Sequence, residues 1–380
     1  MKILHVVNIS FVLPNFIGEQ FDHFIAKGMK IYVACTPSSH FDSYSQEKGF
    51  VPVRVNILRE INIFADLKAI FALRKVIIEQ KIDIVIGHTP KGAMIAMIAS
   101  FLANNSKRIY FRHGLMYETS TGLRRFLLKS VEKLTGQLAS KVVCVSRSIV
   151  EKSEEDHLND PEKNLLLNEG SCNGVNLTKF SVKNINRQST INLNTLFEIN
   201  ENDKVVGYVG RLVKDKGIEE LLSAWRILER TRSDIKLLLV GPFEDRDSIE
   251  DDDKAYVDNS KSIIHAGLQY DVSCFYSLMD VFILPSYREG FGQVILEASA
   301  MQLPIITTRS TGCINAILEG KTGIYCDINP EDIARKIEFY LDNPSLAKAH
   351  GENGRLFVER NYDQEIIWEE IEEKVLEIEK

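Results

Sequence analysis

Residues 203–222, DKVVGYVGRLVKDKGIEELL, decide the fold, because they pass from an apolar run through a glycine-bearing turn into a helical pattern. The run at 205–209 is continuously apolar, as in a strand that is buried on both faces of a parallel sheet. Beyond Gly217, apolar residues recur at helical spacing. A strand that leads into a helix in this way is the repeating unit of a parallel α/β sheet.

The same rhythm fills both halves of the chain, and it restarts at Asp203 after a polar, Asn-rich stretch. A length of 380 residues, with 44% hydrophobic and 26% charged residues, is enough for two globular domains. We therefore predict an α/β protein of two Rossmann-like domains, whose parallel sheets face an interdomain cleft. Strands are expected at 3–9, 29–35, 51–57, 81–88, 107–113 and 140–146, and again at 203–210, 235–241, 262–267, 281–286, 303–308 and 322–326.

Domain boundaries follow from this pattern. The first domain is expected at residues 1–175 and the second at 176–360, with a linker near 175–203. The closing segment, 361–380, has an amphipathic pattern and is predicted to be a helix that crosses back to the first domain. The acidic run at 245–253 is predicted to be a surface loop.

Charge and composition exclude several classes of protein. The net charge of −7 argues against general nucleic-acid binding, although residues 1–175 alone hold 22 Lys and Arg against 17 Asp and Glu. The opening segment MKILHVVNIS has one basic residue and a short strand-like run, so we expect neither a signal peptide nor a membrane span there and predict a cytoplasmic protein. The six cysteines lack the paired spacing of a zinc site and are interpreted as reduced packing residues.

Two cations follow the strand at 205–209. Arg211 and Lys216 lie in the turn GRLVKDKGIE (210–219), at the carboxyl end of the predicted strand and beside a helix N-terminus. Cationic side chains and helix N-termini both favour anions, so a diphosphate would fit here. Solvated surface charges are the alternative interpretation of this motif taken alone.

A second motif, LPSYREGFGQVILEA (284–298), again joins a strand to a helix. Gly290 and Gly292 allow backbone N–H groups to approach a ligand closely. Glu297 has two acceptor oxygens that suit a pair of vicinal hydroxyls, and Glu289 lies at the other side of the turn. The alternative is that Glu289 is a loop charge and that Glu297 is favoured only by the helix dipole.

These residues resemble family 4 of the retaining glycosyltransferases, which have the GT-B fold. The family's Glu-x7-Glu pattern is present as EGFGQVILE (289–297), and GRLVKDKGIEELL (210–222) resembles its other signature. NGVNLTKF (173–180) resembles the family's interdomain segment, and the three motifs stand in the family's order. HTPKGAMIAMIASFLA (88–103) and RHGLMYETSTG (112–122) look like the branch that builds capsules and lipopolysaccharides.

The resemblance implies a nucleotide-sugar donor, with uridine as the base, and no metal or other cofactor. By it, Arg211 and Lys216 hold the donor diphosphate and Glu297 holds the ribose hydroxyls. Glu289 would contact the transferred sugar, together with the donor-binding residues Gly290, Phe291, Gly292 and Gln293. The leaving diphosphate would help to deprotonate the acceptor hydroxyl, and the sugar would be transferred with retention. The triple Asp251–Asp253 is read as a solvated charge run rather than as a metal site.

Two histidines stand at carboxyl ends of predicted strands in the first half, where functional residues gather. His113 matches the histidine that the resembled family places near the donor sugar and the reacting carbon, so it joins Glu289 as a catalytic candidate. His88 and Lys91 are candidates for an acceptor diphosphate, although a lone histidine is more often structural. Gly18 lies in the first strand–helix turn, which is near the acceptor in that family.

Residues 121–141 predict a basic amphipathic helix, with only Glu132 opposing its Lys and Arg residues. Such a helix could rest on the inner face of the cytoplasmic membrane, which would suit a lipid-linked saccharide acceptor. A helix packed on the sheet with a solvated outer face is the alternative. The apolar positions of this helix are Leu123, Phe126, Leu127, Val131, Leu134 and Leu138.

Three other functions compete with this interpretation. A GT-B-fold sugar-nucleotide epimerase or phosphorylase would share the architecture, and a non-catalytic sugar-nucleotide or glycan-binding protein could retain it. A dinucleotide dehydrogenase would require GxGxxG after the first strand, whereas the turn NISFVLPNFIGE (8–19) offers only Gly18.

Overall fold

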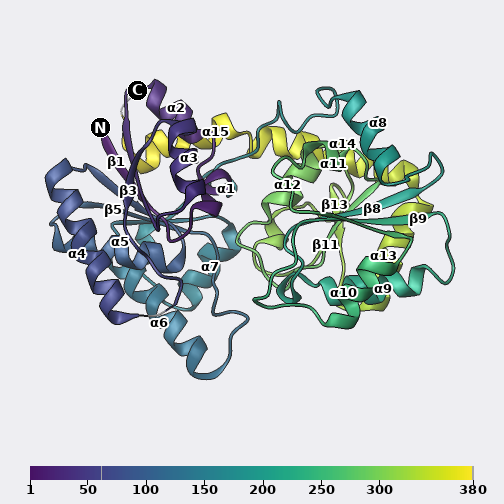
Figure 1. Cartoon of the computed structure of the whole chain (residues 1–380), viewed down its shortest axis with the longest axis horizontal. Helices are drawn as coiled ribbons and strands as arrows, with labels where there is room; N and C mark the ends of the chain where they lie inside the picture. The colour runs from purple at the N-terminus through teal and green to yellow at the C-terminus, as the bar shows by residue number, and fades with distance from the viewer. Residues whose placement is uncertain (61, 379–380) are drawn as a thin grey trace. The chain divides into compact units, whose positions relative to one another are not determined.

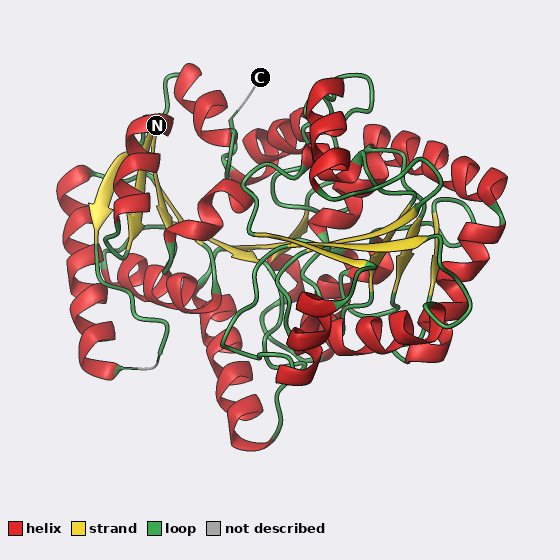
Figure 2. Cartoon of the chain, turned by 45° about the vertical axis from the view of Figure 1, so that its right-hand side comes forward, coloured by secondary structure: helices red, strands yellow, loops and turns green. Residues whose placement is uncertain are grey.

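The structure is a computed structural model that describes residues 1–60 and 62–378. The chain divides into two compact units (Figure 1): the first comprises Met1–Gly174 and Glu365–Lys380, and the second comprises Val175–Gln364. Each unit contains one parallel sheet with helices on both of its faces (Figure 2). Burial on both faces explains why the strands read as continuous apolar runs.

The sheet of the first unit has the order β3-β2-β1-β4-β5-β6-β7, with every neighbouring pair parallel. The six strands predicted in this half are confirmed. The seventh, β7, was not predicted, because it is a short edge strand that includes a polar residue. The strands are β1 (Lys2–Val6), β2 (Lys30–Cys35), β3 (Val51–Arg54), β4 (Ile84–Gly87), β5 (Lys107–Arg112), β6 (Lys141–Cys144) and β7 (Asn164–Leu166).

Two apolar clusters cover the two faces of this sheet. Leu4 of β1 belongs to the cluster under α4, α5 and α7, whereas Ile3 belongs to the cluster under α1–α3. The closing helix α15 adds Ile367 and Trp368 to the second cluster, so the end of the chain is part of the first unit. The helices are α1 (Leu13–Phe16), α2 (Gln20–Ala26), α3 (Ser39–Lys48), α4 (Ile63–Gln80), α5 (Pro90–Leu102), α6 (Gly122–Leu138), α7 (Arg147–Glu155) and α15 (Gln364–Glu370).

The sheet of the second unit has the order β10-β9-β8-β11-β12-β13 and is also parallel. All six strands predicted here are confirmed. They are β8 (Lys204–Val209), β9 (Ile235–Val240), β10 (Ile263–Gly267), β11 (Val281–Leu284), β12 (Ile305–Thr307) and β13 (Gly323–Tyr325). The helices are α8 (Arg187–Leu196), α9 (Ile218–Leu228), α10 (Asp251–Asn259), α11 (Ser273–Tyr276), α12 (Gln293–Ala300), α13 (Pro330–Asp342) and α14 (Pro344–Asn361).

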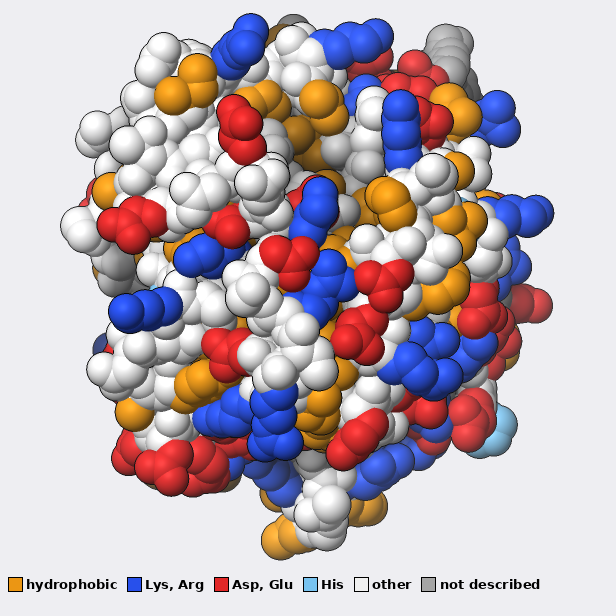
Figure 3. Space-filling view, turned by 90° about the vertical axis from the view of Figure 1, so that its right-hand side faces the viewer, with side chains coloured by type: hydrophobic (Ala, Val, Ile, Leu, Met, Phe, Trp, Pro, Cys, Tyr) orange, Lys and Arg blue, Asp and Glu red, His pale blue; other side chains and the backbone are white. Residues whose placement is uncertain are grey.

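Two segments that were predicted as irregular contain helices. The stretch at 175–203 includes α8, whose N-cap Asn186 accepts hydrogen bonds from the backbone N–H groups of Gln188 and Ser189. The residues Asp251–Asp253 form the first turn of α10 rather than a loop, because carboxylates are favoured at a helix N-terminus. On the face drawn in Figure 3, acidic and basic side chains are interspersed, so the charge there is mixed in sign.

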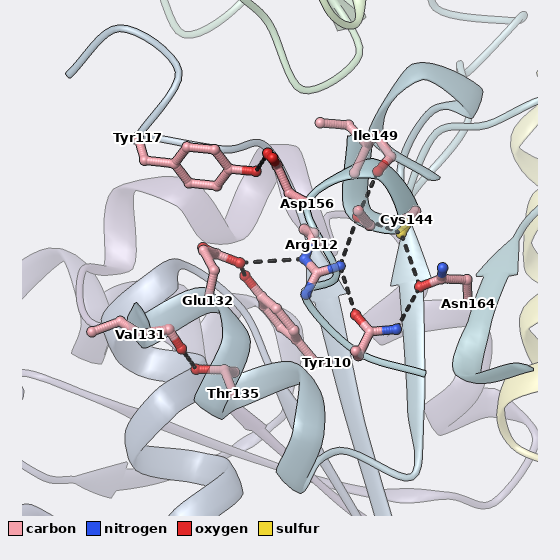
Figure 4. A network of polar contacts seen from close by, with 12 residues as sticks. Tyr110, Arg112, Tyr117, Val131, Glu132, Thr135, Cys144, Ile149, Asp156 and Asn164 are labelled. Atoms are coloured by element: carbon pink, nitrogen blue, oxygen red, sulfur yellow. Dashed lines mark hydrogen bonds and ion pairs between the residues drawn. The ribbon is translucent and has the colours of Figure 1, made fainter. Parts of the chain in front are cut away.

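Helix α6 packs on the first unit in a way that the sequence did not predict. Glu132 is buried, and its Oε2 lies 3.3 Å from Nε of Arg112 and accepts a hydrogen bond from Tyr110 at 2.8 Å (Figure 4). Arg112 also donates to Ser153 at 2.8 Å and to Asn159 at 2.9 Å. Glu132, the one acidic residue among the basic residues of this helix, is therefore buried, where it neutralises the guanidinium of Arg112.

Candidate functional site

The candidate donor site lies at the point of the second sheet where the strand order reverses. Strand β8 has β9 on one side and β11 on the other, so the chain leaves β8 and β11 next to each other. Arg211 and Lys216 follow β8, and Glu289 follows β11. Open parallel sheets bind ligands outside the carboxyl ends of their strands at such a reversal.

Glycines let the loops at this edge approach one another closely. Gly217 has φ +71, and a Cβ there would lie 2.1 Å from the carbonyl oxygen of Pro285. At Gly241, which follows β9, a Cβ would lie 1.9 Å from the carbonyl oxygen of Gly210. Because any side chain would force backbone apart at both positions, the spacing of these loops depends on glycine.

Asp215 joins the loop after β8 to the loop after β11. Its Oδ2 lies 2.8 Å from Nη2 of Arg288. Its carbonyl oxygen accepts hydrogen bonds from the Tyr287 N–H at 3.1 Å and from the Ser286 hydroxyl at 3.2 Å. Sequence reasoning missed these contacts, because an Asp in a turn gives no sign of its distant partner. They fix the two halves of the candidate site relative to each other.

Lys216 and Glu289 form an ion pair. Their side chains are only 13% and 16% exposed, so the pair is largely shielded from water. Arg211 is more open: its Nη1 lies 2.8 Å from Oε2 of Glu244, and its side chain is 42% exposed. The hydroxyl of Tyr208 donates to the Arg211 carbonyl oxygen at 2.9 Å and orients the start of the loop. The structure thus brings together two cations and the first carboxylate of the Glu-x7-Glu pattern.

Glu297, the second carboxylate of the pattern, lies one turn into α12. Its Oε2 accepts a hydrogen bond from the hydroxyl of Tyr276 at 3.0 Å. Its Oε1 has no hydrogen-bond partner within the described part of the chain. Burial raises the pKa of Glu297 to about 7, against the lowering effect of the Tyr276 hydrogen bond. Tyr276, which the sequence motif did not reveal, therefore holds this carboxylate with one oxygen available.

The turn before α12 presents backbone rather than side chains. Gly292 is the N-cap of α12 and has φ +65, a conformation that favours glycine. The side chain of Phe291 is buried and packs on Tyr362, with ring centroids 5.2 Å apart, so Phe291 can meet a ligand at this point through its backbone. Gly290 and Gln293 complete the turn. At the neighbouring strand ends, His265 lies 2.9 Å from the Gly241 carbonyl oxygen.

In the first unit, three histidines form a hydrogen-bonded chain at the reversal between β1 and β4. Nδ1 of His5 lies 3.0 Å from Nε2 of His88, and Nδ1 of His88 lies 2.9 Å from Nε2 of His113. Phe16 stacks on His113 with ring centroids 3.7 Å apart and an angle of 5° between the planes. His5 and Phe16 were missed by sequence reasoning, because neither belongs to a motif.

His88 and Lys91, the predicted acceptor-diphosphate residues, both have partners within the first unit. His88 is 2% exposed, and both of its ring nitrogens face other histidines. Lys91 is engaged as well, because its Nζ lies 2.9 Å from Oδ1 of Asp66 and donates to the carbonyl oxygen of Glu60. Gly18 has φ +51, and a Cβ there would lie 2.5 Å from the carbonyl oxygen of Pro14.

Comparison with known proteins adds independent information. The chain matches the model "Glycosyltransferase Family 4" over residues 15–163 and the model "Glycosyl transferases group 1" over residues 195–357. The capsular polysaccharide biosynthesis glycosyltransferase CapM of Staphylococcus aureus is 33% identical over 98% of this chain and 96% of its own length. An Escherichia coli enzyme described as UDP-Gal:alpha-D-GlcNAc-diphosphoundecaprenol alpha-1,3-galactosyltransferase is 27% identical over 84% of this chain and 79% of its own.

The solved structure of Anabaena HepE with UDP and glucose aligns over all of both chains, with a TM-score of 0.83 and 16% identity. The lipopolysaccharide glycosyltransferase WaaG aligns over 99% of both chains, with a TM-score of 0.77 and 17% identity. Together with the two parallel α/β units, these alignments confirm the predicted GT-B fold class.

Proposed function

We propose, from the premise that the chain belongs to the glycosyltransferases of group 1 and family 4, that it transfers a sugar from a nucleotide-sugar donor to a saccharide with retention of configuration. The observation that carries this proposal is the shielded Lys216–Glu289 pair at the reversal of the second sheet, followed in the chain by Glu297 on α12. The cation Lys216 matches a diphosphate, and the carboxylate of Glu289 matches a sugar hydroxyl. Glu297, with one available oxygen, matches a ribose diol.

In the proposed reaction, the bond between the anomeric carbon and the diphosphate oxygen breaks, and a bond from that carbon to the acceptor oxygen forms. The acceptor proton passes to an oxygen of the leaving diphosphate. Arg211 and Lys216 stabilise the charge that develops on this diphosphate. In a site that excludes water, one preorganised donor group lowers the free energy of the transition state by roughly 3–4 kcal/mol. Because these two side chains supply the positive charge, we propose that no metal is required.

Uridine is the proposed base. HepE has been crystallised with UDP, and the name of the Escherichia coli relative specifies UDP-galactose, so both relatives support this choice. The relatives also support a place in surface polysaccharide assembly, because CapM is named for capsule biosynthesis. The same Escherichia coli name specifies a diphosphoundecaprenol-linked acceptor, and we propose a lipid-linked saccharide here as well.

The direct test is transfer of radiolabelled sugar from a panel of UDP-sugars to lipid-linked acceptors, with and without EDTA. We expect Glu289→Gln and His113→Ala to lower kcat at least about tenfold, a loss of more than about 1.4 kcal/mol at the transition state. The control is Glu319→Gln, which removes an exposed carboxylate that pairs with Arg309 in the same unit. Normal transfer by both active-site variants would remove these residues from the reaction. Interconversion of UDP-sugars without transfer would indicate an epimerase instead, and binding without any turnover would indicate a non-catalytic protein.

Membrane contact through α6 is the second part of the proposal. The apolar positions Leu123, Phe126 and Leu127 are 73%, 66% and 44% exposed, so the N-terminal part of the predicted apolar face is turned away from the core. Arg124 and Arg125 are exposed on the same turns. An unburied apolar stripe flanked by cations matches the chemistry of an anionic lipid surface.

Helix α4 also exposes apolar and basic residues. Phe64 and Phe71 are 87% and 59% exposed, and Lys68 and Lys75 lie on the same helix. Both α4 and α6 pack against α5, so their exposed sides belong to one layer of the first unit. No described helix is long and apolar enough to cross a bilayer.

Vesicle co-sedimentation tests the membrane part separately from transfer. The wild-type protein should sediment with vesicles that contain anionic lipid and should not sediment with neutral ones. A variant with Arg124→Glu, Arg125→Glu and Phe126→Ser should lose this binding, whereas Lys348→Glu, an exposed charge change in the second unit, should retain it. Sedimentation that is independent of anionic lipid and of these changes would contradict the proposed contact.

A further inference from the structure

The chain of three histidines, His5, His88 and His113, is not accounted for by the proposed donor site. His5 is within β1, His88 directly follows β4, and His113 directly follows β5, so three neighbouring strands contribute one residue each. His5 and His88 are 4% and 2% exposed, while His113 is half-buried. Two consecutive ring-to-ring hydrogen bonds connect them, at 3.0 and 2.9 Å.

The charge state of the three rings limits how the chain can be protonated. Burial lowers the pKa of His5 and of His113 to about 3, and burial together with the neighbouring histidines lowers the pKa of His88 well below its usual range. All three rings are therefore neutral near pH 7, with one N–H each. His88 must then donate one hydrogen bond and accept the other, so both bonds run in the same direction.

Only two arrangements satisfy this condition. In the first, Nε2 of His113 donates to Nδ1 of His88, and Nε2 of His88 donates to Nδ1 of His5, so every ring carries its proton on Nε2. In the second, every ring carries its proton on Nδ1 and both bonds are reversed. The Nε2–H form is the intrinsically favoured tautomer of a neutral histidine, so the first arrangement places all three rings in their favoured state.

We propose that His5 and His88 are positioning residues that hold His113 as its Nε2–H tautomer, with Nδ1 presented as a hydrogen-bond acceptor to a hydroxyl of the transferred sugar. Nδ1 of His113 has no hydrogen-bond partner within the described part of the chain, so it is available to a ligand. Phe16 stacks on the ring and fixes its plane. The hydrogen bond between His113 and the sugar rests on the proposed function, whereas the tautomer of His113 does not.

A neutral acceptor at this point suits the proposed chemistry. The reacting sugar becomes electron-poor as the diphosphate leaves, and a hydroxyl that donates to a neutral nitrogen keeps more electron density than one that faces a cation. A protonated His113 would repel the positive charge that develops on the reacting sugar. The buried relay prevents that protonation at neutral pH, and it also fixes which nitrogen faces the ligand, a detail that determines whether His113 donates or accepts.

The experiment is ¹⁵N NMR of the full chain with labelled histidine, without any substrate, at pH 7.5. Protonated and unprotonated ring nitrogens resonate far apart, so the tautomer of each ring can be read directly, and the signals of His113 are assigned with His113→Gln. The expected result is Nε2 protonated and Nδ1 unprotonated in His113. The reverse pattern, or a charged ring, would overturn the proposal without any activity measurement.

Two variants at His5 test the relay. His5→Phe keeps a buried ring beside Phe21 but removes the acceptor for His88, so His113 should become a mixture of tautomers. In transfer assays, kcat should fall at least about fivefold, while KM for the donor stays within about twofold. His5→Asn offers an amide oxygen near the position of Nδ1 and should restore both the spectrum and kcat.

Binding of UDP serves as the control, because the candidate nucleotide-binding residues lie in the other unit and UDP affinity should be the same in all three proteins. Unchanged His113 signals in His5→Phe would overturn the relay. If the tautomer is as expected in the wild-type protein and no donor supports transfer, the proposed function fails and the relay stands.

Discussion

Replacing Glu297 with Gln should make the second unit more stable and, at the same time, a weaker binder of nucleotide. Burial raises the pKa of Glu297 from 4.5 to about 7, so the folded state disfavours its charge. Between these values the unfolded chain binds fewer protons than the folded one, and stability therefore falls as pH rises through this window. A shift of one pKa unit corresponds to about 1.4 kcal/mol, so ionised Glu297 lowers the free energy of unfolding by about 3 kcal/mol above pH 7. Solvent contact of this partly buried group reduces this effect to about 1–3 kcal/mol.

Glu297→Gln keeps the shape of the side chain and an acceptor for the Tyr276 hydroxyl, but it removes the charge. The free energy of unfolding should rise by about 1–3 kcal/mol at pH 8 and should be almost unchanged at pH 4.5. UDP affinity at pH 8 should fall about tenfold or more, because hydrogen bonds to a charged acceptor are worth about 1.5–3 kcal/mol.

Urea unfolding followed by fluorescence measures the stability of the second unit. The chain has two tryptophans, of which Trp225 lies in α9 and Trp368 in α15, so a Trp368→Phe background leaves Trp225 to report on the second unit. Glu201→Gln, at an exposed carboxylate in the same unit, is the matched control and should change stability little at either pH. An equal stability of wild type and Glu297→Gln at pH 8 would refute the reasoning, as would a difference that is the same at both pH values.

Two further predictions concern packing. Gly217→Ala should destabilise the second unit by more than about 2 kcal/mol, because it combines a φ of +71 with a Cβ only 2.1 Å from the Pro285 carbonyl oxygen. Gly320→Ala, where φ is +69 but the added Cβ would meet no other residue beyond its chain neighbours within 4 Å, should cost only about 1 kcal/mol, and equal urea midpoints for the two variants would contradict the close approach. Glu132→Gln should destabilise the first unit by about 3–5 kcal/mol, because it leaves the buried Arg112 without a counter-ion. Adding Arg112→Met to it should recover much of that loss in unfolding followed through Trp368, and a further loss would show that the pair is not coupled.

The sequence by itself determined the local features of this protein. Twelve of the strands follow from runs rich in Val and Ile, and most of these runs are continuously apolar because their strands are buried on both faces of a parallel sheet. The two motifs after β8 and β11 follow from glycine turns and charged residues at fixed spacing. Local composition was a poorer guide where polar side chains cap or begin a helix, and both α8 and the first turn of α10 were taken for irregular chain for that reason.

Only the tertiary structure decided which side chains meet. Glu289 pairs with Lys216, 73 residues away, because strands that are distant in sequence are neighbours in the sheet. His5, His88 and His113 meet for the same reason, and no sequence motif indicated that their rings are in contact. Helix α6 shows the same limit. Its amphipathic pattern was visible in the sequence, but the burial of Glu132 on this helix involves Arg112, a residue of strand β5. Periodicity reports the environment of one segment, whereas a pair of charges depends on two segments that folding brings together.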